Sequence, residues 1–370
     1  MTDVPDLRPE LDLLLRLADP REPGGEAGPS GVEFDWGLFL DAAFRHRVAA
    51  LVGSAMARRG LIEPDSRTEY VRDALTAAAA LNERRNAVLL AEAARLVQTL
   101  ADKGTTVAVR KGAYLTPAVY RATHLRPMND IDLFVDRDEA PAVADVLRGE
   151  GYQAGTVDAH GNLVPMTRRQ EVFWGMHVNN LPSYQRLGDS WLPAVTVDVC
   201  FGLFLPASGC DLPAGRLLSQ AVPFDLCGTT ALAFRPEHML LDVAAHLYKE
   251  STTLRYIERG KHQRLLQYVD VVSLVRAHPD LSWDTLVDEA VAAGAARNLY
   301  FALANAAALF PGSIPRPALA RLADAAAVDE RFLVEYGEGD TGERRSWSAR
   351  DITERLFSDE RPDARSQSLV

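Results

Sequence analysis

The chain has 370 residues, of which 47% are apolar and 25% charged, and its formal net charge is −11. The composition is typical of a globular protein, and the acidic balance argues against non-specific DNA or RNA binding through a broad basic face. The three cysteines lack metal-ligand spacing, and the sequence shows neither a secretory signal nor an apolar run of about 20 residues. We therefore expect a cytoplasmic protein without a membrane segment.

Residues 1–103 are predicted to form a helical N-terminal region. Apolar residues recur at helical spacing in 7–18, in 35–59 and in a longer stretch over 66–103, where Gly104 supplies a stop signal. The last of these helices would lead the chain into the first strand of a sheet.

Residues 104–235 are predicted to form an α/β core, and its most informative stretch begins with a short β-rich run. Lys111 and Gly112 then suggest a turn, 113–120 suggests a helix, and a strand carries Asp130 and Asp132. Residues two apart in a strand lie on the same face, so the two acids are predicted to lie side by side.

Two adjacent carboxylates repel each other unless a cation lies between them. Magnesium prefers carboxylate oxygens together with substrate phosphates, so Asp130 and Asp132 are candidate Mg²⁺ ligands, with Mn²⁺ as a substitute. Glycine at a strand-to-helix turn lets a phosphate approach backbone N–H groups, which makes Gly112 a candidate phosphate contact. Lys111 could neutralise β- or γ-phosphate charge, or could simply be an exposed lysine in a turn.

The pairing of Lys111-Gly112 with the string LRPMNDIDL at 125–133 resembles the uncharacterised nucleotidyltransferase family of the polymerase-beta superfamily. The superfamily pattern is a glycine turn, a helix, and a strand with two aspartates separated by one residue. The resemblance implies a small mixed sheet with flanking helices and transfer of a nucleotide from a nucleoside triphosphate. It also implies a third acid on a neighbouring strand.

Asp198 is the candidate for this third acid and a further metal ligand. In the predicted strand 194–204, apolar and polar residues alternate, and a lone aspartate in such a strand requires a partner. The alternative is an aspartate on a surface or edge strand. Further strands are predicted at 152–158, 171–181 and 229–234, and a covering helix at 138–150.

Residues 236–336 are predicted to form a helical C-terminal domain, followed by a polar tail over 337–370 that is either partly disordered or a short docking segment. By resemblance, the helical domain lies beside the nucleotide. Lys261 is therefore a candidate triphosphate contact, and Arg126 is a candidate phosphate ligand or an ion-pair partner of Asp130 or Asp132. Asp270 lies in an apolar helix and should have an arginine or lysine partner.

The sequence thus predicts a metal-dependent nucleotidyltransferase, with ATP as the favoured nucleotide and a hydroxyl, amine or phosphate acceptor on a small molecule or peptide. Two alternatives remain open. One is a tRNA-modifying or toxin-like nucleotidyltransferase that uses a local basic cleft. The other is a non-catalytic nucleotide-binding module, against which the presence of all three acids argues.

Overall fold

The structure is a computed structural model that describes residues 7–21, 34–61, 68–188, 191–206, 208–329, 331–338 and 342–358. The chain divides into two compact units. The helical unit comprises Met1–Asn82, His124–Arg126 and Val243–Val370, and the sheet unit comprises Glu83–Thr123 and Pro127–Asp242. The boundaries after Asn82 and Asp242 both fall inside helices.

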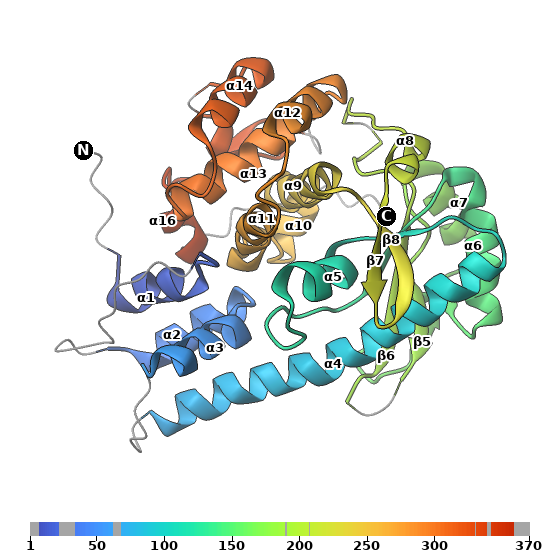
Figure 1. The fold of residues 1–370 in the computed structure, drawn as a ribbon, viewed down its shortest axis with the longest axis horizontal. Coiled ribbons are helices and arrows are strands. Elements are labelled where there is room, and N and C mark those ends of the chain that lie inside the picture. Colours follow the sequence, from blue (N-terminus) through green and yellow to red (C-terminus); the bar gives the residue numbers. More distant parts are fainter. Residues whose placement is uncertain are drawn as a thin grey trace. The chain divides into compact units, whose positions relative to one another are not determined.

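The sheet unit is built on a mixed sheet with the strand order β4-β3-β5-β6-β2-β1-β8-β7, which confirms the predicted α/β class (Figure 1). The strands are β1 (Ala108–Val109), β2 (Ile131–Phe134), β3 (Gln153–Val157), β4 (Leu163–Pro165), β5 (Tyr184–Leu187), β6 (Ala194–Cys200), β7 (Val222–Leu226) and β8 (Thr229–Ala233). The pairs β2–β6 and β1–β8 are parallel, and the other pairs are antiparallel. Strands distant in the sequence therefore meet at the centre of the sheet.

Helices accompany this sheet, and apolar side chains from the central strands form its core. The helical segments are the C-terminal part of α4 (Glu69–Asp102), α5 (Lys111–Tyr114), the π-helical turn η1 (Leu115–Tyr120), the 3-10 turn η2 (Arg137–Glu139), α6 (Ala140–Gly149), α7 (Arg168–His177) and α8 (Ala214–Ser219). Phe134 and Phe234 are fully buried, with ring centroids 5.0 Å apart in an edge-to-face contact. β2 is buried along its whole length, so its side chains are held from both faces.

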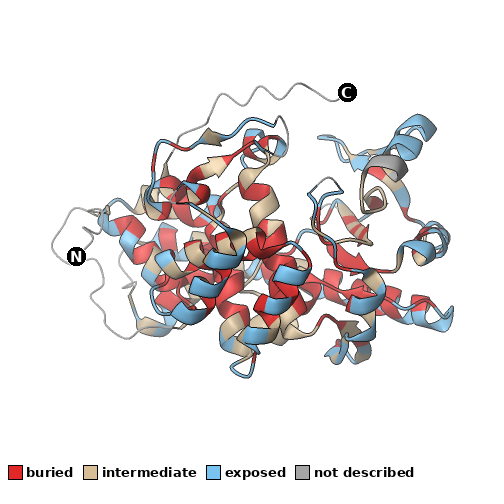
Figure 2. Cartoon of the chain, turned by 90° about the horizontal axis from the view of Figure 1, so that it is seen from above, coloured by how far each residue is buried: buried red, intermediate tan, exposed pale blue. Residues whose placement is uncertain are grey.

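The helical unit consists of short helices that pack against one another. It contains α1 (Pro9–Ala18), α2 (Trp36–Arg45), α3 (Ala49–Arg59), the start of α4, most of α9 (Pro236–Thr252), α10 (Leu254–Glu258), α11 (Leu265–Ala277), α12 (Trp283–Ala292), α13 (Ala296–Leu309), α14 (Arg316–Ala326) and α16 (Ile352–Phe357). α13 packs against α11, α12, α14 and α16, and most of its residues are buried. Figure 2 shows that helices of the protein carry buried residues on one side and exposed residues on the other. No helix within the described ranges combines the length and the apolar content that crossing a bilayer requires.

One predicted element is wrong, and one strand was missed. The predicted strand at 171–181 is instead the helix α7, which begins after Thr167 in a capping box with Gln170. The strand β7 was not predicted. The described part of the predicted polar tail is folded, because it contains β10 (Arg345–Ser346), which pairs with β9 (Glu335–Tyr336), and the helix α16, and it buries Trp347.

A buried histidine marks the break between α2 and α3, a stretch whose spacing suggested uninterrupted helix. His46 is 3% exposed, and its Nδ1 accepts a hydrogen bond of 3.3 Å from the N–H of Leu265. Burial, assisted by the charges of Arg45 and Arg264, lowers the pKa of His46 to about 3. The folded helical unit therefore holds this imidazole neutral.

We expect His46 to make the helical unit less stable as the pH falls from 7 to 5. The unfolded chain protonates His46 below its ordinary pKa of 6.5, whereas the folded chain does so only near 3, so its contribution is complete above pH 6.5 and is lost below it. Over this interval the loss amounts to about 2 kcal/mol. We expect the wild type to lose about 2 kcal/mol more of its free energy of unfolding between pH 7 and pH 5 than His46→Asn does, as measured by urea unfolding. The side-chain oxygen of the asparagine can still accept the hydrogen bond from Leu265.

The control is His160→Asn at an exposed position, which should keep the pH dependence of the wild type. If His46→Asn and the wild type lose the same stability between pH 7 and pH 5, His46 does not titrate in this way.

Candidate active site

Asp132 and Asp198 lie side by side on the sheet. β2 pairs with β6 in parallel, and the two aspartates are direct Cα partners in that register. Neighbouring strands are about 4.8 Å apart, and side chains at paired positions project from the same face. Asp130 lies two residues before Asp132, just ahead of β2, and is half-buried. The sheet register thus brings together carboxylates that are separated by 66 positions in the sequence.

Residues at the ends of the two neighbouring strands form hydrogen bonds with Asp198 and Asp132. Ser183, immediately before β5, donates a hydrogen bond from its hydroxyl to Asp198 Oδ1. On the other side, the backbone N–H of Arg110, which follows β1, donates to the carbonyl oxygen of Asp132 at 3.0 Å. Neither Ser183 nor Arg110 was predicted as a site residue. Ser183 carries no local sequence signal, because only the antiparallel pairing of β5 with β6 brings it to Asp198.

Lys111 forms an ion pair with Asp132. Its Nζ lies 2.8 Å from Oδ1 of Asp132, and the two side chains are only 17% and 6% exposed. Burial alone would lower the pKa of the Lys111 ammonium, but the adjacent Asp132 carboxylate outweighs burial, and the pKa is raised. Lys111 is thus held charged in a nearly dry position, which differs from the exposed turn lysine that was the alternative.

The backbone at Lys111 also differs from the prediction of a simple turn. Helix α5 begins at Lys111 itself, and this residue has φ +41°, a left-handed conformation that side chains other than glycine rarely adopt. Gly112 is buried in the first turn of α5, where its carbonyl oxygen accepts a hydrogen bond from the Leu115 N–H. A strained residue that is held in place by its surroundings is frequently found at a functional site.

A buried ion pair lies next to the start of helix α5. Arg110 donates from Nε to Asp242 Oδ2 at 2.9 Å and from Nη2 to Asp242 Oδ1, and the two side chains are 4% and 1% exposed. Burial would lower the pKa of Arg110, but the charge of Asp242 outweighs it and the pKa is raised. Asp242 was missed, although it interrupts the apolar face of a predicted helix just as Asp270 does.

Two predicted phosphate ligands belong to the helical unit. Arg126 makes a bidentate pair with Asp270, with distances of 2.8 and 2.9 Å, which confirms the prediction that Asp270 has a basic partner. Lys261 is exposed between α10 and α11. The roles of Arg126 and Lys261 toward a phosphate stay predictions.

The charges of the carboxylate row suit a divalent cation. Asp130, Asp132 and Asp198 carry three formal negative charges, and Lys111, which is paired with Asp132, supplies one positive charge. Carboxylate oxygens are the donors that Mg²⁺ and Mn²⁺ prefer. In the conformation described, no three His, Cys, Asp or Glu side chains within the described ranges lie close enough to share one ion. The oxygen ligands of the row fit a divalent metal by their type, whereas in this conformation the cation in contact with Asp132 is the Lys111 ammonium.

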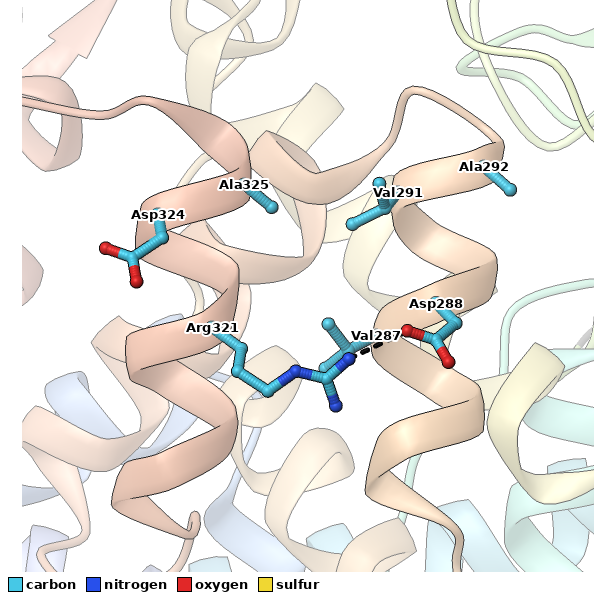
Figure 3. A pocket seen from close by; sticks show the side chains of 7 residues that line it. All are labelled: Val287, Asp288, Val291, Ala292, Arg321, Asp324 and Ala325. Atoms are coloured by element: carbon cyan, nitrogen blue, oxygen red, sulfur yellow. Dashed lines mark hydrogen bonds and ion pairs between the residues drawn. The ribbon is translucent and has the colours of Figure 1, made fainter.

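A separate hollow lies in the helical unit between α12 and α14. Figure 3 shows Arg321 reaching across it toward Asp288, with Nη2 2.7 Å from Oδ1. The hollow is lined by Val287, Asp288, Val291, Ala292, Arg321, Asp324 and Ala325. None of these is a predicted site residue, and the hollow contains no arrangement of nucleophile and base.

A family model described as "Uncharacterised nucleotidyltransferase" matches residues 32–311, a range that includes the whole carboxylate row, Lys111 and Asp242. The chain belongs to the uncharacterised nucleotidyltransferase family. The resemblance carried by Lys111-Gly112 and by 125–133 is therefore confirmed.

Among solved structures, this nucleotidyltransferase family member is similar to the crystal structure of an antigenic nucleotidyltransferase-like protein from Paracoccidioides brasiliensis. The two are 16% identical with a TM-score of 0.36, and the match covers 64% of this chain and 92% of that chain. No curated protein matches the sequence.

Proposed function

We propose that the protein is a metal-dependent nucleotidyltransferase that moves a nucleoside monophosphate from a nucleoside triphosphate to an acceptor. The observation that supports this proposal best is the in-register pair Asp132–Asp198 on β2 and β6, with Asp130 two residues before and Lys111 in contact. These side chains lie within the part of the chain that the nucleotidyltransferase family model matches.

In the proposed reaction, an acceptor oxygen or nitrogen forms a bond to the α-phosphorus, the bond between that phosphorus and the bridging oxygen breaks, and pyrophosphate leaves. Asp130, Asp132 and Asp198 would hold Mg²⁺ or Mn²⁺. When bound, such a metal stabilises negative charge on the phosphates and lowers the pKa of a coordinated hydroxyl.

The side chains themselves have further roles in this proposal. Asp198 accepts the proton of the acceptor as a general base, and the hydroxyl of Ser183 orients that carboxylate through its hydrogen bond. Lys111 and the backbone at Gly112 bind the β- and γ-phosphate oxygens.

The acceptor is proposed to be a small molecule or a peptide. A formal net charge of −11 disfavours a polyanionic acceptor such as tRNA, because nucleic acid binding depends on neutralising phosphates with Lys and Arg. Arg255, Arg259 and Lys261 are nevertheless exposed near one another in the sequence, so tRNA belongs in the set of acceptors to be tested.

The test is pyrophosphate release by the purified full-length protein with each of the four nucleoside triphosphates, Mg²⁺ or Mn²⁺, and pooled acceptors that include tRNA. We expect release with ATP that depends on an acceptor and disappears when EDTA removes the metal. Release that persists in EDTA would contradict the metal dependence. Nucleotide binding in calorimetry that is indifferent to Mg²⁺, without release, would favour a non-catalytic module.

A further inference from the structure

The Lys111 ammonium is in contact with the carboxylate of Asp132, which a metal ion would need as a ligand. The Lys111 ammonium lies 2.8 Å from Asp132 Oδ1, and the Asp132 side chain is only 6% exposed. Asp132 is also the most buried acid of the row, since Asp130 and Asp198 are only half-buried. A metal ion that binds Asp132 must therefore compete with a cation that is already in contact with this carboxylate.

Moving the Lys111 ammonium away from Asp132 has a free-energy cost of its own. The Lys111 side chain is 17% exposed, and moving its ammonium away from Asp132 leaves a poorly hydrated charge that needs another anion. The left-handed backbone at φ +41° holds Lys111 at the start of α5, so its ammonium can move only as far as its side chain allows. The triphosphate of a nucleotide would supply such an anion within the same site.

Resting on the proposed function, we propose that Lys111 is an internal counter-ion of Asp132 that gives way to a metal ion only when nucleotide phosphate is present to receive it. Metal alone then binds weakly, since it must compete with the lysine. Metal and nucleotide bind cooperatively, because the triphosphate accepts the displaced ammonium. Linkage requires the same coupling in both directions, so the metal also strengthens nucleotide binding.

The test measures Mn²⁺ binding directly, by the loss of the electron paramagnetic resonance signal of free Mn²⁺, in the absence and presence of a non-hydrolysable ATP analogue. We expect Lys111→Met to bind Mn²⁺ without nucleotide about tenfold or more tightly than the wild type, because a positive charge next to a ligand has been removed. The analogue should strengthen Mn²⁺ binding by the wild type and have much less effect on the variant.

Two further variants keep this test decisive. Lys111→Gly removes the same charge and suits the left-handed backbone, so it should reproduce the tighter Mn²⁺ binding even if Lys111→Met folds poorly. Lys103→Met removes an exposed lysine of the same unit and should bind Mn²⁺ as the wild type does. Thermal melts in added Mn²⁺ should show a larger stabilisation of both Lys111 variants than of the wild type.

The outcomes separate this proposal from the proposed function. If both Lys111 variants fold but bind Mn²⁺ no more tightly than the wild type, while the wild type releases pyrophosphate in a metal-dependent reaction, the counter-ion role is wrong and the transferase stands. If Asp132→Asn and the wild type bind Mn²⁺ equally in the presence of the ATP analogue, Asp132 is not a metal ligand, and both proposals fall.

Discussion

Replacing Asp242 with asparagine is expected to lower the free energy of unfolding by about 3–5 kcal/mol, because it leaves the Arg110 guanidinium buried without a counter-charge. The pair is almost inaccessible to water, with exposed fractions of 4% and 1%, so solvent cannot replace the lost carboxylate. Arg110 also follows directly on β1 and donates its backbone N–H to Asp132, so a displaced Arg110 would disturb the carboxylate row as well.

This expectation can be checked by urea unfolding of a double-mutant cycle. Removing both charges in Arg110→Met with Asp242→Leu should cost less than the sum of the single replacements, since neither charge is then left alone. The matched control is Asp145→Asn, which breaks an exposed pair with Arg148 in the same unit and should cost less than about 1 kcal/mol. If Asp242→Asn lowers the free energy of unfolding no more than Asp145→Asn does, the buried pair stabilises the protein no more than an exposed pair.

The helices could be predicted largely because apolar periodicity and stop signals act within a few turns of chain. The helix predicted at 138–150 contains α6 at Ala140–Gly149, and Gly104 follows the end of α4 at Asp102. Local signals were also misjudged. The alternation in 171–181 suggested a strand, whereas the capping box of Thr167 and Gln170 correctly marks a helix start. β7, which was not predicted, contains Pro223, and it is the last strand of the sheet, where proline is tolerated.

The site was only partly predictable, because its geometry depends on pairing between segments that are distant in the sequence. Alternation along β2 and β6 identified Asp132 and Asp198 as candidates, but the register that makes them direct neighbours is a property of the folded sheet. The pair Arg110–Asp242 joins residues 132 positions apart, and no local pattern predicts which buried acid a given arginine meets. A charged residue within an apolar segment of sequence indicates that it has an ion-pair partner, but the sequence does not show which residue that partner is.

Replacing Asp130 with asparagine is expected to abolish nucleotidyl transfer while the protein stays folded. Asp130 is half-buried ahead of β2, and the replacement leaves the Lys111–Asp132 pair intact, so stability should change little. The neutral amide offers one oxygen acceptor in place of a charged carboxylate, which makes it a poor ligand for a hard divalent cation. We expect pyrophosphate release to fall by about 10³-fold, as when a group that stabilises transition-state charge is lost.

The measurement is the rate of pyrophosphate release at saturating ATP and Mg²⁺, with thermal melts to establish that Asp130→Asn is folded. Asp145→Asn, an exposed aspartate of α6 in the same unit, is the control and should keep the rate of the wild type. Asp198→Asn should also lose activity, but Ser183 can still donate to the amide oxygen, so its fold should be preserved. Near-normal turnover by folded Asp130→Asn would refute the metal role of Asp130.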